Sequence, residues 1–260
     1  MLTTSNGFVR IAEINPPELP DQRHWDLRGA WDHVLITDNV FGKIRVSPYA
    51  FGARITHDVP EVHPTVVVST RDRNILAIES EVRGALGNGV DSFLVVIGDT
   101  MPTVDHLAHH YEIVEHLRKL QAVMPPFEVG MPTRFQRWMF QKRIDVGAQF
   151  FLAGPVIDPL DVEPNMDRLG RKDDEPPVFL AAIPPFSPAW IQRAEGLGAV
   201  PASHELKARI AETPNGERRA LAWELTRETA QRAREAGSAG IVVMGLRFRT
   251  LIGEAARELG

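Results

Sequence analysis

Short runs rich in β-branched and apolar residues alternate along this chain with longer segments of helical periodicity, and that alternation limits the folds open to it. Eight such runs are predicted to be strands, at 8–13, 44–56 with an interruption, 65–69, 92–97, 127–129, 149–152, 178–183 and 240–244. Regular strand–helix alternation is the signature of parallel βαβ units. An open doubly wound sheet would be favoured by a glycine-rich turn after the first strand, and none is present. We therefore expect one (β/α)8 TIM barrel domain over residues 1–260.

Helices are predicted between the strands, at 73–86, 104–123, 133–146 and 218–236, where apolar residues recur at helical spacing. The stretch 154–177 carries five prolines and many acids, so it cannot form one continuous helix. Strand-like sequence resumes on both sides of it. We expect a long loop on the active face rather than an interdomain linker.

Composition narrows the function classes. The 260 residues include 34 acidic and 29 basic side chains spread along the chain, with a net charge of -5, so no broad basic face is expected for nucleic acid. There is no cysteine, which fits a reducing compartment, and the cytoplasm is the expected location. No signal peptide is recognised, and no apolar run reaches the roughly 20 residues of a membrane helix.

Polar residues that end predicted strands are the first candidates for chemistry, because the active site of a parallel barrel forms at the carboxyl ends of its strands. Glu13 closes the first strand, Thr56 with His57 and Asp58 closes the second, and Asp99 follows Gly98 after the fourth. The alternative for each is a loop acid or a helix cap, and Asp99 in particular precedes a predicted helix.

Glu13 has a further argument in its favour. It lies inside an apolar strand and is followed by Ile14, Asn15 and two prolines, which form a rigid exit from the strand. An acid held there, away from bulk water, should have a raised pKa and could donate a proton near neutral pH. Glu13 is therefore predicted to be a general acid.

Three histidines, His106, His109 and His110, fall on one predicted helix, and the spacing of His106 and His110 is that of zinc ligands in metalloproteases. The catalytic glutamate of that motif is absent. We interpret them as a solvated face of an outer helix and expect no metal site.

Taken in order, several short motifs resemble the methylenetetrahydrofolate reductase family. The first strand ends in an acid, two residues and two prolines, and the second is predicted to end in a threonine. The matching residues are Glu13-Ile-Asn-Pro-Pro, Thr56, Arg71-Asp-Arg-Asn, Gly98-Asp99, Lys142-Arg143-Ile-Asp-Val-Gly-Ala, Ile183-Pro-Pro and Leu246-Arg247.

The resemblance implies a (β/α)8 barrel that reduces 5,10-methylenetetrahydrofolate to 5-methyltetrahydrofolate with NAD(P)H, usually through FAD. Folate and a nicotinamide cofactor would be its partners. Glu13 would protonate N10 of the folate, Asp99 would stabilise the cationic pterin or iminium, and Thr56, His57 and Gly98 would line the binding site.

The chain departs from the family pattern where FAD would bind, since polar residues usual there are replaced by Val67, Ile97, Gly130, Gly154, Met139 and Gln136. A flavin-free branch of the family transfers hydride directly and is thought to use a second glutamate. Glu61 is the nearest candidate, with His57 and Asp58 as rivals. Both the FAD-dependent and the flavin-free versions stay open.

Two other functions compete with the reductase. One is a folate-dependent barrel that transfers a methyl or methylene group, and the other is a non-catalytic pterin- or flavin-binding protein. The presence of Glu13 favours catalysis over binding alone. A homo-oligomer is left open by the sequence.

Overall fold

Eight parallel strands close into a barrel in chain order, with β8 hydrogen-bonded to β1. The computed structural model describes residues 1–260 except 6, 20–26, 28–30, 100–108, 247–248 and 260. The strands are β1 (Val9–Ile14), β2 (His33–Ile36), β3 (His63–Ser69), β4 (Ser92–Val96), β5 (Glu128–Thr133), β6 (Phe150–Val156), β7 (Val178–Ala182) and β8 (Gly240–Val243). The fold class predicted from the sequence, a single-domain (β/α)8 TIM barrel, is confirmed.

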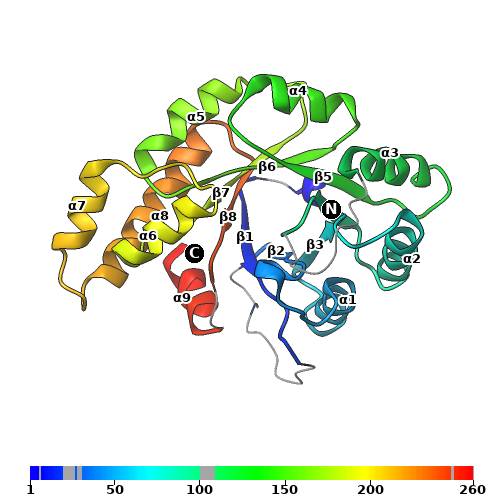
Figure 1. Cartoon of the computed structure of the whole chain (residues 1–260), viewed down its shortest axis with the longest axis horizontal. Helices are drawn as coiled ribbons and strands as arrows, with labels where there is room; N and C mark the ends of the chain where they lie inside the picture. Colours follow the sequence, from blue (N-terminus) through cyan, green and yellow to red (C-terminus); the bar gives the residue numbers. More distant parts are fainter. Residues whose placement is uncertain (6, 20–26, 28–30, 100–108, 247–248, 260) are drawn as a thin grey trace.

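Helices surround the strands (Figure 1). They are α1 (Pro48–Asp58), α2 (Ile75–Leu86), α3 (His110–Leu120), α4 (Arg137–Asp145), α5 (Val162–Leu169), α6 (Pro188–Gly196), α7 (His204–Glu212), α8 (Arg218–Glu235) and α9 (Arg249–Leu259), with 3₁₀ turns η1 (Leu2–Thr4), η2 (Val40–Gly42) and η3 (Pro159–Asp161). The helix predicted at 104–123 is described only from its later part, where α3 begins at His110.

Side chains that point inward from the strands form a small core inside the barrel. In β1 these are Val9 and Ile11, and Glu13 is the next residue on the same face. The other strands contribute buried side chains that include Leu35, Val67, Leu94, Phe150, Phe179 and Val242. Ala12 and Ile14 point the other way, into the larger core between strands and helices. Glu13 therefore follows an apolar barrel interior at the carboxyl end of β1.

The amino-terminal end of the barrel is closed by η1. Leu2 belongs to the core inside the barrel. The backbone N–H groups of Leu2 and Thr3 donate to the carboxylate of Glu128 at the start of β5, the second at 3.0 Å. Glu128 is buried, so this end is stabilised by charge-assisted hydrogen bonds.

Two predicted elements are wrong. The strand expected at 44–56 is instead helix α1, which begins at Pro48 because proline suits the first helical position. The second strand is the four-residue run His33–Ile36. The loop expected at 154–177 contains η3, capped by the Asp158 side chain, and helix α5, which ends at left-handed Gly170.

Candidate active site at the mouth of the barrel

A cavity of about 370 Å³ opens at the carboxyl-terminal end of the strands, which we call the mouth. Each strand or the segment directly after it contributes to its lining, through residues that include Glu13, Leu35, Val67, Val96, Pro132, Leu152, Ala181 and Met244. Most of these side chains are apolar, and the acids Glu13, Asp38 and Asp99 lie among them. An apolar pocket with a few polar groups is the usual form of a small-molecule site.

Glu13 is the acid of the described cavity lining that lies within a strand, β1, rather than in a segment after one. Burial raises the pKa of its carboxyl from 4.5 to about 7, although a hydrogen bond from Gly245 opposes the shift. That bond runs from the Gly245 N–H to Oε1 of Glu13 at 3.3 Å and orients the carboxyl. Near neutral pH the acid is therefore present in both protonated and ionised forms, as a proton-transfer group requires.

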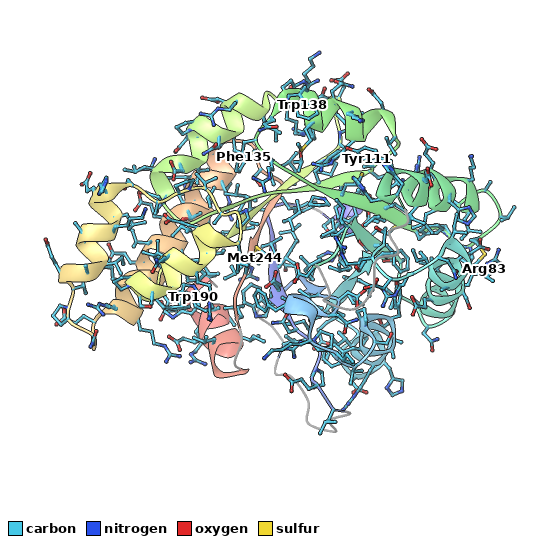
Figure 2. The ribbon with its side chains drawn as sticks, in the orientation of Figure 1. Arg83, Tyr111, Phe135, Trp138, Trp190 and Met244 are labelled. Carbon is cyan, nitrogen blue, oxygen red and sulfur yellow. The ribbon has the colours of Figure 1, made fainter. Side chains whose placement is uncertain are left out.

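Gly245 also determines how closely helix α6 approaches. It has φ +77, and a Cβ built on it would lie 2.6 Å from the Trp190 ring. Only glycine allows both the backbone conformation and this contact. Figure 2 shows Met244 near the middle of the ribbon and Trp190 to its lower left, whereas Trp138 lies at the upper edge.

One face of α6 forms a wall of the mouth cavity, through Trp190, Arg193, Ala194 and the following Leu197. These positions follow the spacing of one helical face. Arg193 is exposed, and no acid in the described part of the chain lies within ion-pair distance of it. Among the described residues that line the cavity, Arg193 is therefore the cationic side chain, beside the acids Glu13, Asp38 and Asp99. The sequence prediction missed α6, although Ser187 and Pro188 are recognisable start signals for a helix.

Asp99 and Gly98 lie at the mouth, where the sequence placed them. Both line the cavity, and Gly98 has φ +88, with Ser69 so close that a side chain there would collide with it. Oδ2 of Asp99 accepts a hydrogen bond from the Phe41 N–H at 2.5 Å. Asp99 is thus tied to the segment that follows β2.

Asp38 is a cavity residue that the sequence prediction missed. Its buried carboxylate receives both terminal nitrogens of Arg73, one of them at 3.3 Å, and the Ser69 N–H at 3.4 Å. The paired charges hold the ends of β2 and β3 together. The signal was the polar run that begins at Thr37, which was overlooked because β2 was placed elsewhere.

Thr56, His57 and Glu61 are not brought to the mouth. Thr56 lies in the last turns of α1, where its hydroxyl donates to the Gly52 carbonyl at 3.1 Å. The His57 side chain is 89% exposed, and its Nδ1 is 2.9 Å from Oδ1 of Asp58. Glu61 lies at the opposite end of the barrel.

That opposite end, the base, has a second cavity of about 590 Å³. Glu61 lines this base cavity together with polar residues that include Ser5, Arg10, Asp32, His33, His63 and Arg234. Glu61 therefore lines a different cavity from Glu13, and the described residues that line the mouth cavity include no second glutamate.

Histidine and acid groups that could hold a metal ion do not come together in the part of the chain that the structure describes. His106 lies outside that part, while His109 occupies the N-cap position of α3 without a side-chain capping bond and His110 begins the helix. In the described ranges no helix has both the length and the apolar character needed to cross a membrane.

The solved structures that share this fold include a lyase and an acetylhydrolase. A 2,3-dimethylmalate lyase, described as a PEP mutase/isocitrate lyase superfamily member, has a TM-score of 0.57 and 12% identity over 97% of this chain and 81% of that protein. An oxaloacetate acetylhydrolase has a TM-score of 0.54 and 10% identity over 98% of this chain and 80% of that protein. No family model and no curated protein sequence matches the chain. At such identities the likeness shows the fold alone.

The expectation of a methylenetetrahydrofolate reductase is wrong. The barrel enzymes that the chain resembles in structure are a lyase of another superfamily and an acetylhydrolase. One motif behind the expectation also fails physically, because Thr56 lies in a helix rather than at a strand end. The oxidoreductase activity, NAD(P)H, FAD and folate depended on that resemblance, as did the methyl-transfer and pterin-binding alternatives, and all are withdrawn.

Proposed function

We propose that this protein is an enzyme of the lyase or hydrolase kind that acts on an organic acid, with Glu13 as its general acid. The observation that carries the proposal is the carboxyl of Glu13, buried at the mouth with a pKa of about 7. Strongly shifted pKa values in a cavity are typical of catalytic groups. The position at the carboxyl end of a barrel strand is also where such groups occur.

Glu13 would act in its protonated form. When a bond in the substrate breaks and leaves negative charge on an oxygen or carbon, the neutral carboxyl can donate its proton to that atom. The Gly245 N–H, 3.3 Å from Oε1, then helps to stabilise the carboxylate that remains. The apolar side chains around the cavity limit water near the group and keep its pKa high.

Arg193 supports an organic acid as the substrate class. It is a cation at the wall of a cavity whose other described lining residues are mostly apolar, with a few acids and neutral polar groups, and guanidinium groups bind carboxylates well. The fold adds support, since the lyase and the acetylhydrolase that share it are named for dimethylmalate and oxaloacetate, which are organic acids. The cytoplasmic location stays a prediction that cell fractionation would test.

The test is a screen followed by a pH profile. Purified protein is incubated with a panel of 2-hydroxy, 3-hydroxy and 2-oxo acids, and cleavage products are detected by mass spectrometry. For the acid that is turned over, kcat/KM is measured between about pH 5 and pH 9, and we expect it to fall as the pH rises through about 7.

Glu13→Gln should lower turnover about 100-fold or more, because the amide cannot donate an acidic proton. Glu18→Gln is the matched control, since Glu18 is an exposed acid shortly after the same strand and should leave turnover unchanged. A Glu13→Gln variant with normal turnover and an unaltered pH profile would exclude Glu13 from the chemistry.

A further inference from the structure

The segment after β2 presents an aromatic side chain at the mouth in a strained conformation. Phe41 has φ 60 and ψ 28, in the left-handed region that a bulky residue rarely adopts. Asn39 and Gly42 are left-handed too, with φ 46 and φ 66. Because the Phe41 side chain is 48% exposed, its burial in the fold does little to offset this strain.

Contacts with two polar side chains hold this turn in place. Asp99, at the end of β4, accepts the Phe41 N–H at 2.5 Å. The Asn39 side chain accepts the Arg45 N–H at 3.0 Å and donates to Asp38 at 3.1 Å. The strained backbone is therefore fixed by specific hydrogen bonds, as is usual where strain is retained for function.

A second aromatic ring lines the same cavity from helix α6. Trp190 on α6 is packed against Gly245, and the Phe186 ring lies with its centroid 6.5 Å away. These neighbours fix the indole in place. The described lining of the mouth cavity thus contains two flat side chains, Phe41 after β2 and Trp190 after β7.

We propose that Phe41 and Trp190 are specificity-determining residues that receive a planar aromatic group of the substrate, and that Asp99 is a positioning residue that holds Phe41 through its backbone N–H. The inference deepens the proposed function and depends on it for the reaction. Aromatic rings attract each other beyond what the buried area provides. A saturated group of the same skeleton fills the cavity but lacks that attraction.

Binding of two unreactive acids tests the proposal, 2-naphthoate and its saturated counterpart decahydro-2-naphthoate, measured by isothermal titration calorimetry. We expect the wild-type protein to bind the planar acid about tenfold more tightly than the saturated one. Phe41→Ala and Trp190→Ala should each remove most of this preference. Trp138→Ala is the control, because Trp138 is 64% exposed on α4 and does not line the cavity.

Two further variants separate positioning from general damage. Asp99→Asn keeps an oxygen that can accept the Phe41 N–H and should keep the planar preference, whereas Asp99→Ala removes the acceptor and should lose it. Phe41→Gly should lose the preference with an unchanged or higher melting temperature, because glycine relieves the left-handed strain.

Equal affinity of the wild-type protein for the two acids would overturn the proposal, and so would a preference that survives in Phe41→Ala and Trp190→Ala. A preference kept by Asp99→Ala would overturn the role of Asp99. Because these probes are not turned over, the outcome is separate from the Glu13 test, and either proposal can fail while the other stands.

Discussion

Each end of the barrel buries an ionisable group whose pKa is strongly shifted, an acid at the mouth and a histidine at the base. At the mouth, burial raises the pKa of the Glu13 carboxyl to about 7. At the base, burial and the nearby His63 ring lower the pKa of His33 to about 4. In both places the neutral form is favoured, because the charged form loses hydration. The effects on stability are opposite, since the mouth is weakened at alkaline pH and the base at acidic pH.

The ends also differ in how they are built. At the base, η1 inserts Leu2 into the barrel and Glu128 binds its backbone. At the mouth, a cavity remains and Phe41 keeps a strained backbone. Barrels of this class commonly place stability at the amino-terminal face and chemistry at the carboxyl-terminal face. Burial of an ionisable group therefore serves either purpose, depending on whether the group is open to a ligand.

The largest expected effect is at the base. Glu128→Ala should lower the free energy of unfolding by about 4 kcal/mol, because it removes two hydrogen bonds to a buried carboxylate. Chemical denaturation measures this. Glu115→Ala, an exposed acid on α3, is the control and should change stability by less than about 0.5 kcal/mol. A small loss in Glu128→Ala would show that η1 does not stabilise the base.

The next prediction concerns the mouth and its pH dependence. Below pH 4.5, the ordinary pKa of the group, Glu13 is protonated in both the folded and the unfolded chain. Between pH 4.5 and about pH 7, Glu13 is ionised in the unfolded chain but stays mostly protonated in the folded protein. Stability is therefore lost as pH rises through this window, by up to about 3 kcal/mol. Glu13→Gln lacks this loss, so it should gain stability relative to the wild-type protein as pH rises to about 8. Chemical denaturation of both proteins across this pH range measures the difference. An equal change of unfolding free energy with pH in Glu13→Gln and the wild-type protein would contradict the prediction.

At the base, stability is lost as the pH falls rather than as it rises. His33 stays neutral in the folded protein down to a pKa of about 4, whereas the unfolded chain takes up the proton near 6.5. Lowering the pH from about 7 to about 5 should therefore cost about 2 kcal/mol. His33→Gln should lack the loss of stability that comes from protonation of His33. Thermal unfolding at the two pH values, compared between variant and wild type, measures the difference.

The smallest expected effect sharpens the division between the two ends. Glu61→Gln should leave kcat/KM within about twofold of wild type, because Glu61 lines the base cavity rather than the mouth. The same assay that tests Glu13 applies. A loss near 100-fold would mean that the base takes part in the reaction.

Much of the fold could be predicted from the sequence, and so could the position of Glu13, Gly98 and Asp99 at the mouth. Glu13 was found because an acid within an apolar strand before two prolines has few structural reasons to be there. The position of Thr56 was predicted wrongly, because a helix that begins at Pro48 was interpreted as a strand. That interpretation put Thr56 at the mouth, whereas it lies in the last turns of α1.

Other parts of the site depend on contacts that no local pattern encodes. The Asp38 carboxylate accepts hydrogen bonds from Arg73, which lies 35 residues away in the chain. The Gly245 contacts with Glu13 and Trp190 join the first strand, α6 and the segment after β8. Such pairs become visible only when the barrel closes.

Titration of the Glu13 carboxyl tests whether this group is still protonated near neutral pH, as a general acid must be. Carbon NMR of the protein labelled with ¹³C at glutamate carboxyls, compared with Glu13→Gln to assign the signal, gives its pKa in the folded state. We expect a midpoint at about pH 7. A midpoint near the ordinary value of 4.5 would mean that Glu13 is ionised at neutral pH, and the proposed general acid would be lost.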